Sequence, residues 1–149
     1  MELTELKTQE YKKNKRKLVQ DYIYEINGYK ITVPKGFVTD GASVPDILKP
    51  LYNPFGKYFP AAVVHDYLYS KYNNTGINRT LADKIFLFIM KELKIDRSIR
   101  RKFYWAVRCF GELSWKKKLF NEGYKDQALI DRTDEAVAYY KYWDKILKL

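Results

Sequence analysis

An alternation of apolar and polar positions predicts the first regular elements of the chain. Residues 18–26 are rich in aromatic and β-branched side chains, and Asn27-Gly28 follows them. This dipeptide favours the tight turn of a β-hairpin. Residues 29–33 are then expected to form the returning strand, and residues 37–39 a third short strand. The pattern predicts a small antiparallel sheet with Asp40 at its exit.

Apolar residues at helical spacing dominate the remainder of the chain. Ser43 begins a capping box, which predicts a short helix ending near Leu48. Longer helices follow where apolar stripes and capping residues coincide. Their expected ranges are 60–72, 79–93 behind the cap Asn78, 97–111, and a last helix from Asp131 or Thr133 to about 147. The sequence therefore predicts an α+β fold, in which a small antiparallel N-terminal sheet packs on four or five helices.

The stripe of the 97–111 helix predicts which of its side chains face the core. We expect inward positions for Ile99, Phe103, Val107 and Phe110. Cys109 lies beside Phe110 and is expected to be buried as a small apolar side chain. The three tryptophans are interpreted as core or interface anchors, at positions 105, 115 and 143.

Length and composition indicate one domain with two extensions. The chain of 149 residues is the size of a single domain. Residues 1–17 are polar and lysine-rich, so we interpret them as an N-terminal arm, and residues 18–115 as the globular domain. Residues 116–149 form a C-terminal extension ending in the last helix. The leading hypothesis is that both extensions contact other chains.

Several classes of protein are excluded by composition. The single cysteine excludes an internal disulfide and a multi-cysteine zinc site. No run of 18 apolar residues occurs, so no membrane span is predicted, and residues 1–17 lack the apolar core of a signal peptide. A reducing cytosol fits these features, and a virion assembled there fits equally well.

The net charge of +10 suggests a polyanionic partner. Ten basic and three acidic residues lie between positions 91 and 118, so most of the excess is concentrated there. The candidate nucleic-acid contacts are Arg97, Arg100, Arg101, Lys102, Arg108, Lys116, Lys117 and Lys118. No DNA-reading motif accompanies them, so only phosphate contact without sequence preference is implied. An ordinary solvated helix face, or a dock for an acidic protein, explains the same residues.

A polar cluster is predicted between the third strand and the helix that follows. Its members are Asp40, Ser43, His65 and Asp66. One interpretation is a metal-assisted hydrolase, in which Asp40, His65, Asp66 and Asp83 hold magnesium or manganese. HD phosphohydrolases need further histidines, and the chain has only one.

Two other interpretations explain the same residues. In a serine hydrolase, His65 would activate Ser43, although Ser43 lacks the G-x-S-x-G elbow. In a structural lock, Asp40 stabilises its own turn, and His65 pairs with a carboxylate to hold the loop against the helix. Adjacent helical residues point about 100° apart, so His65 and Asp66 are expected to have different partners. The residues favour the lock, with no cofactor.

The motifs resemble a family of uncharacterised proteins from tailed bacteriophages and bacterial prophages that share a domain of unknown function. The family pattern is V-P-x-G-F-x-T-D-x-A-S-x-P, then H-D-x-L-Y, A-D-x-x-F and F-G…W. Here these motifs occupy residues 33–45, 65–69, 82–86, and 110–111 with Trp115. The resemblance implies a phage gene and supplies no activity.

The sequence and the resemblance together lead to one functional hypothesis with two alternatives. The hypothesis is a non-enzymatic virion- or tail-associated component that docks on other phage proteins through its arms and aromatic surface. The alternatives are the divalent-metal-assisted hydrolase and a nonspecific nucleic-acid-binding accessory protein.

Overall fold

The computed structural model describes residues 1–41, 53, 55–122, 141–145 and 147. The predicted helix from Ser43 to Leu48 lies outside these residues, as do both candidate caps of the last helix, Asp131 and Thr133. Residues 141–145 are helical, and Trp143 and Leu147 are buried as predicted for that helix.

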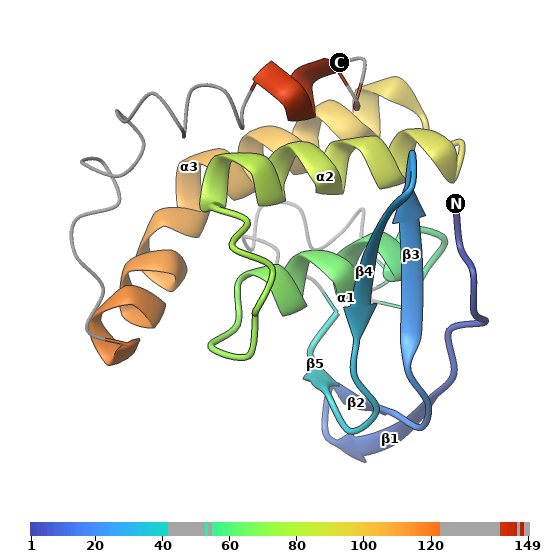
Figure 1. Ribbon diagram of the computed structural model, residues 1–149. Coiled ribbons are helices and arrows are strands. Elements are labelled where there is room, and N and C mark those ends of the chain that lie inside the picture. Colours follow the sequence, from blue (N-terminus) through green and yellow to red (C-terminus); the bar gives the residue numbers. More distant parts are fainter. Residues whose placement is uncertain (42–52, 54, 123–140, 146, 148–149) are drawn as a thin grey trace.

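The described elements confirm the α+β class. Five short strands precede three helices (Figure 1). The elements are β1 (Thr8–Lys12), β2 (Lys15–Leu18), β3 (Tyr22–Ile26), β4 (Tyr29–Val33), β5 (Val38–Thr39), α1 (Phe59–Leu68), α2 (Arg79–Glu92) and α3 (Arg97–Glu122).

The predicted hairpin is confirmed by β3 and β4. The two strands pair antiparallel, from Tyr22↔Val33 to Ile26↔Tyr29. Asn27 and Gly28 adopt φ of 48° and 90°, the left-handed region that a tight hairpin turn requires. One face of the hairpin enters the core, because side chains at alternate positions point to the same side of a strand. The buried residues on the two strands are Tyr22, Tyr24, Ile26, Ile31 and Val33.

Residues 1–17, which the sequence suggested as a polar arm, contain β1 and most of β2. These strands form a second sheet in the order β1-β2-β5. The third predicted strand therefore pairs with β2 through Arg16↔Thr39 and Lys17↔Val38, not with the hairpin. Leu18 is the only fully buried residue of β1 and β2. The sequence of these strands therefore lacks the alternating apolar pattern that would predict them.

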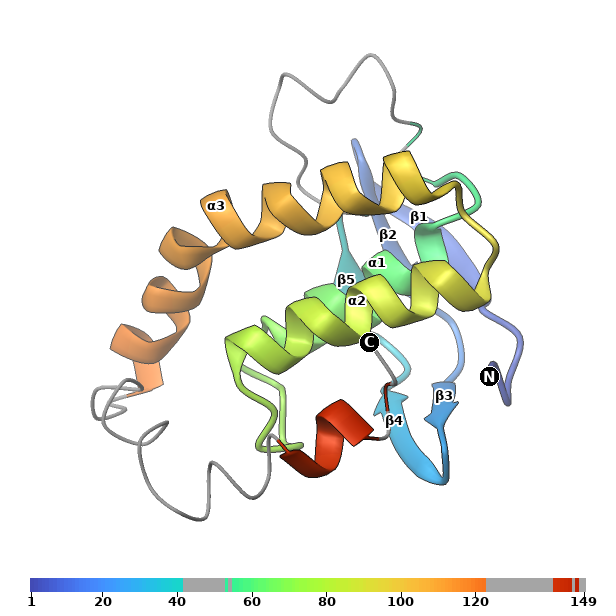
Figure 2. The ribbon, with the colours of Figure 1, turned by 90° about the horizontal axis from the view of Figure 1, so that it is seen from above.

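α2 and α3 begin at the predicted residues, and α2 ends within one residue of its predicted end, whereas α1 and α3 end elsewhere. Asn78 caps α2 by accepting a hydrogen bond from the Leu81 amide at 2.9 Å, which confirms the predicted start. α1 ends at Leu68, earlier than predicted, and the backbone turns over residues 69–72. α3 continues beyond Gly111 to Glu122 and curves in its C-terminal half (Figure 2).

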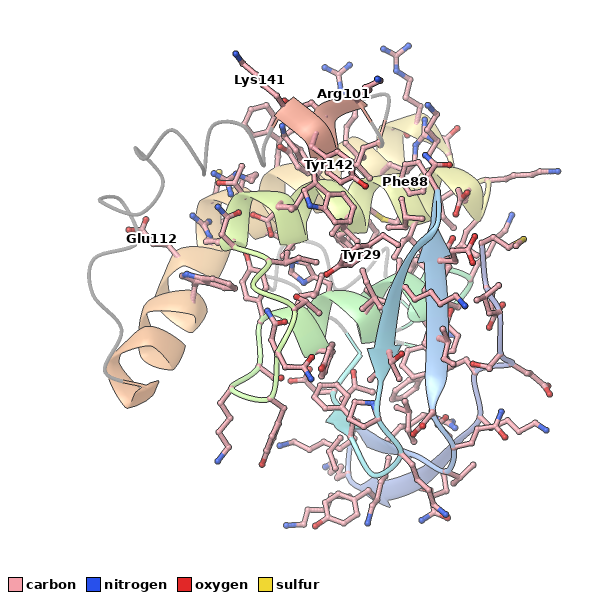
Figure 3. All side chains as sticks on the ribbon, viewed as in Figure 1. Tyr29, Phe88, Arg101, Glu112, Lys141 and Tyr142 are labelled. Carbon is pink, nitrogen blue, oxygen red and sulfur yellow. The ribbon has the colours of Figure 1, made fainter. Side chains whose placement is uncertain are left out.

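The core lies where α1, α2 and the β3–β4 hairpin meet. α2 contacts both α1 and α3, and α1 contacts β4 and β5. The C-terminal segment covers one edge of this core, where the Trp143 ring lies 4.7 Å from the Tyr29 ring, centroid to centroid. Figure 3 shows Tyr29 beneath the helical turn that carries Tyr142. This segment therefore packs on its own domain.

Three side chains of α3 differ in exposure from what the sequence predicts. Phe103 is buried and Val107 is half-buried, as expected. Ile99 and Phe110 are 40% and 62% exposed, so their predicted inward positions are wrong. Cys109 is exposed rather than buried, and Trp105 is 60% exposed. The apolar stripe is longer than the part of α3 that its neighbours cover.

None of the described helices has the length and apolar character needed to cross a membrane.

Candidate functional site

Asp83 of α2 is the centre of the most extensive buried polar cluster in the described part of the chain. Its side chain is completely buried. Oδ1 lies 2.8 Å from Nε2 of His65 and accepts a hydrogen bond from the Tyr69 hydroxyl at 2.6 Å. Oδ2 accepts a hydrogen bond from Nη1 of Arg108 at 2.8 Å. The cluster, which we call the Asp83 network, joins α1, the residue after it, α2 and α3.

Aromatic packing holds the His65 ring in this position. The ring lies 4.2 Å from the Tyr69 ring and 4.8 Å from the Phe86 ring, centroid to centroid. His65 and Tyr69 are four residues apart and therefore lie on one helical face, as do Asp83 and Phe86 at a spacing of three. An ionised carboxylate can only accept hydrogen bonds, so Nε2 of His65 carries the proton in its bond to Asp83.

The hydrogen bonds of the network favour an ionised Asp83. Burial alone would raise the pKa of Asp83, but hydrogen bonds from His65, Tyr69 and Arg108 outweigh this effect and hold the pKa below its usual value. Burial and the adjacent Asp83 charge raise the pKa of the Tyr69 hydroxyl well above its usual value. Tyr69 is therefore a neutral donor, and Arg108 neutralises the Asp83 charge through an ion pair.

The position of Tyr69 depends on the space left by Gly111, and the backbone around Arg108 is held by hydrogen bonds from Arg79. A Cβ atom at Gly111 would lie 2.8 Å from the Tyr69 hydroxyl oxygen, so only glycine leaves room for that side chain. The Tyr69 ring also contacts Trp115 at 5.2 Å, centroid to centroid. Arg79 donates to the carbonyl oxygens of Val107 and Arg108. Gly111 therefore makes room for the Tyr69 side chain and does not mark the end of α3.

A second polar cluster lies at the end of β5. The Thr39 hydroxyl donates to Oδ2 of Asp66 and accepts a hydrogen bond from the Gly41 amide at 3.1 Å. Burial and the negative charge of nearby Asp40 raise the pKa of Asp66 to about 7, although the Thr39 hydrogen bond opposes them. Asp66 therefore changes its charge near neutral pH.

The structure divides the predicted site residues between these two clusters. His65 and Asp66 have different partners, as expected from their adjacent positions on α1. His65 pairs with a carboxylate, as the structural lock predicts, but this pair joins α1 to α2 rather than the loop to the helix. Asp66 instead ties the end of β5 to α1. Ser43 lies outside the described residues.

The four predicted metal ligands do not converge on one point. His65 and Asp83 belong to the Asp83 network, and Asp66 and Asp40 to the cluster at β5. Among the described residues, no group of three histidine, cysteine, aspartate or glutamate side chains is arranged to hold a metal ion. Magnesium or manganese binding stays a prediction, for which Asp40 and Asp66 are the nearest pair of carboxylates among the predicted ligands that the structure describes.

The predicted basic residues of α3 differ in exposure, and one of them is paired with Asp83. Arg97, Arg101 and Lys102 are exposed, and Arg100 is half-buried. Arg108 is engaged by Asp83. The side chains of residues 116–118 lie outside the described part of the structure.

Comparison with known proteins identifies the family but no activity. The family described as "Protein of unknown function (DUF1353)" matches residues 16–107. The chain belongs to this family. The matched region of the DUF1353 family contains the hairpin, both polar clusters except Arg108, and α2. The expected resemblance to a domain of unknown function is confirmed at this level.

One relative extends the comparison to a bacterial protein. The uncharacterised protein y4jT of Sinorhizobium fredii is 31% identical over 99 residues, which cover 64% of this chain and 29% of the relative. The chain thus spans less than a third of that relative's length. No solved structure matches.

Two members of the Asp83 network were missed in the sequence of this DUF1353 protein. Tyr69 ends the H-D-x-L-Y motif but was given no role, although its spacing of four from His65 signalled a shared helical face. Arg108 was interpreted as a polyanion contact, because nothing local reveals that it reaches a carboxylate 25 residues earlier.

Proposed function

We propose that this chain is a non-enzymatic protein of a tailed phage or prophage, made in the host cytoplasm and associated with the virion or its tail. The observation that supports a non-enzymatic role is the state of Asp83. Its side chain is 0% exposed, and both of its oxygens accept hydrogen bonds from the protein. A carboxylate held in this way braces three helices and does not reach a substrate.

We propose that the docking surface lies on α3 rather than on the N-terminal and C-terminal extensions. Residues 1–17 pair with their own domain, and Trp143 packs on Tyr29. Trp105 and Phe110 are more than half exposed on α3. They are five residues apart and point about 140° apart, so a partner must cover a wide part of the helix surface to contact both. Tryptophan and other large aromatic side chains dominate the energetics of protein interfaces, so this pair is the best supported anchor for another phage protein.

Cys109 provides a test without any mutation. It is the only cysteine of the chain, it is exposed, and it lies between the two aromatic anchors in sequence. Purified particles of the phage that carries this gene should contain the protein by mass spectrometry. Maleimide labelling of Cys109 should be at least about tenfold slower in particles than in the free protein. Absence from particles, or equal labelling rates, contradicts the proposal.

A pair of variants separates docking from folding. The double variant Trp105→Ala and Phe110→Ala should enter particles poorly while its thermal unfolding stays close to that of the parent. Tyr72→Ala is the matched control, because Tyr72 is 62% exposed but lies outside α3. Equal incorporation of the parent, the double variant and the control would exclude α3 as the docking surface.

The Asp40 and Asp66 pair supports one alternative, a divalent-metal-assisted hydrolase. The raised pKa of Asp66 next to a second carboxylate is a common feature of functional sites. Calorimetric titration with magnesium or manganese at pH 8 should then show binding that Asp66→Asn abolishes. No heat of binding with either ion rejects this alternative.

A further inference from the structure

The β1–β2 ribbon carries a dense cluster of positive charge that neither the Asp83 network nor the α3 surface uses. Five of the six residues from 12 to 17 are basic, and Tyr11 precedes them. Figure 1 shows this ribbon at the end of the molecule away from the C-terminal segment. Within the described part of the chain, no salt bridge involves any of these five residues.

Strand register places three lysines and one aromatic ring on the same face of the ribbon. Lys12 pairs directly with Lys15, and Lys17 lies two residues from Lys15 and so points to the same side. Tyr11 occupies the point where the register shifts. Its ring centroid lies 5.4 Å from Nζ of Lys12 and 5.7 Å from Nζ of Lys17, and the side chain is 48% exposed.

The opposite face of the ribbon is fixed to the domain. The Arg16 guanidinium lies 4.5 Å from the centroid of the Phe55 ring, and Leu18 is buried. β2 also pairs with β5, whose Thr39 is tied to α1 through Asp66. The exposed face is therefore held on a rigid support and does not need to fold when a ligand binds.

The arrangement is unfavourable for the ribbon alone. Like charges directly opposite each other destabilise an antiparallel pair. Lys12 and Lys15 are such a pair, and neither makes a salt bridge within the described residues. A bound phosphate would remove this repulsion. The exposed Tyr11 ring adds a flat surface on which a nucleobase can stack.

From these contacts we propose that the exposed face of the β1–β2 ribbon binds single-stranded nucleic acid. Phosphates contact Lys12, Lys15 and Lys17, and one base stacks on Tyr11. An unpaired strand fits better than an acidic protein, because acidic side chains would use the lysines and leave the aromatic ring without a role. The α3 surface fits less well, since Arg108 there is engaged by Asp83.

The test uses the full chain and a fluorescent oligothymidylate in an anisotropy titration over a range of salt concentrations. With the three ribbon lysines in contact, the slope of log K against log salt should be about −2. Lys12→Gln with Lys15→Gln should make the slope less steep by about 1.4. Arg97→Gln with Arg101→Gln removes the same charge from α3 and should leave the slope nearly unchanged.

Two substitutions of Tyr11 test the stacking. Tyr11→Ala should weaken binding at least about fivefold, whereas Tyr11→Phe keeps the ring and should stay within about twofold of the parent. Circular dichroism confirms that each variant is folded. The proposal is overturned if the oligonucleotide does not bind at low salt, or if the α3 variant loses as much affinity as the ribbon variant. It is also overturned if Tyr11→Ala binds normally, or if polyglutamate competes as well as unlabelled oligothymidylate, which would indicate an acidic protein partner.

Discussion

Replacing Asp83 by asparagine should destabilise the protein by about 3–5 kcal/mol, the usual cost of removing one partner from a buried ion pair. Asparagine has nearly the same shape, so packing is preserved. It keeps one acceptor oxygen for the bonds from His65 and Tyr69. Its NH2 group would face the Arg108 guanidinium, and two donors cannot bond to each other. Arg108, whose side chain is only 27% exposed, would keep a charge without its partner.

Urea denaturation followed by circular dichroism measures this effect. The midpoint should fall while the slope m stays constant, because the surface exposed on unfolding does not change. For a chain of this length the loss corresponds to a fall in Tm of about 10 °C. Asp144→Asn is the matched control: Asp144 pairs with Lys84 at the surface and is 54% exposed. That change should cost about 0–1 kcal/mol.

The pH dependence provides a second measurement on the same variant. Asp83 has a folded-state pKa below its ordinary value of 3.8. Its contribution is therefore fully present above 3.8 and is lost as pH falls through the folded-state pKa. The stability difference between the parent and Asp83→Asn should be constant from pH 5 to 7 and should shrink in acid. A loss at pH 7 no larger than that of Asp144→Asn would refute the view that the network stabilises the fold.

Three further substitutions test other parts of the structure. Asp66 has a folded-state pKa of about 7, above its ordinary 3.8, so its favourable contribution to the free energy of unfolding is lost as pH rises through 7. In urea titrations, Asp66→Asn should therefore gain stability relative to the parent between pH 5 and pH 8. A stability difference that stays constant over this range would contradict the raised pKa of Asp66. Gly111→Ala should lower Tm despite the higher helix propensity of alanine, because the new methyl group collides with the Tyr69 hydroxyl. The decrease in Tm should be smaller in a Tyr69→Phe background. Equal decreases in the two backgrounds would show that this contact is not responsible. Asn78→Ala should cost about 0.5–2 kcal/mol in the same denaturation assay through loss of the cap on Leu81, and an unchanged midpoint would show that the cap is dispensable.

Features determined by neighbouring residues were predictable from the sequence. Asn27-Gly28 specified the hairpin, and Asn78 specified the start of α2, because both act through the backbone within three residues. The β1–β2 ribbon was missed because its pairing with β5 depends on residues more than 20 positions away, while its own side chains are mostly charged and exposed. A polar lysine-rich segment carries no local sign of such pairing.

The candidate site was predicted in composition but not in geometry. His65, Asp66, Asp83 and Asp40 were all singled out, yet the direction of each side chain is set by the packing of α1 against its neighbours. Asp83 is completely buried beside Phe86 on α2 and so needs a partner. The hydrogen-bond partners of Asp83 come from two other parts of the chain. Arg108 was assigned to the basic surface of α3, because only the packing of α3 on α2 brings its guanidinium close to Asp83.

The placement of Arg108 on α3 has a consequence for how the chain assembles. His65 and Tyr69 meet Asp83 through α1 and α2 alone, but the charge of Asp83 is balanced only when α3 arrives. An intermediate that contains α1 and α2 without α3 would have to keep this carboxylate hydrated or protonated, and either state opposes closure of its core. Packing of α3 and exclusion of water from the core are therefore coupled. In hydrogen exchange, the backbone amides of α1, α2 and α3 should then exchange as one cooperative unit.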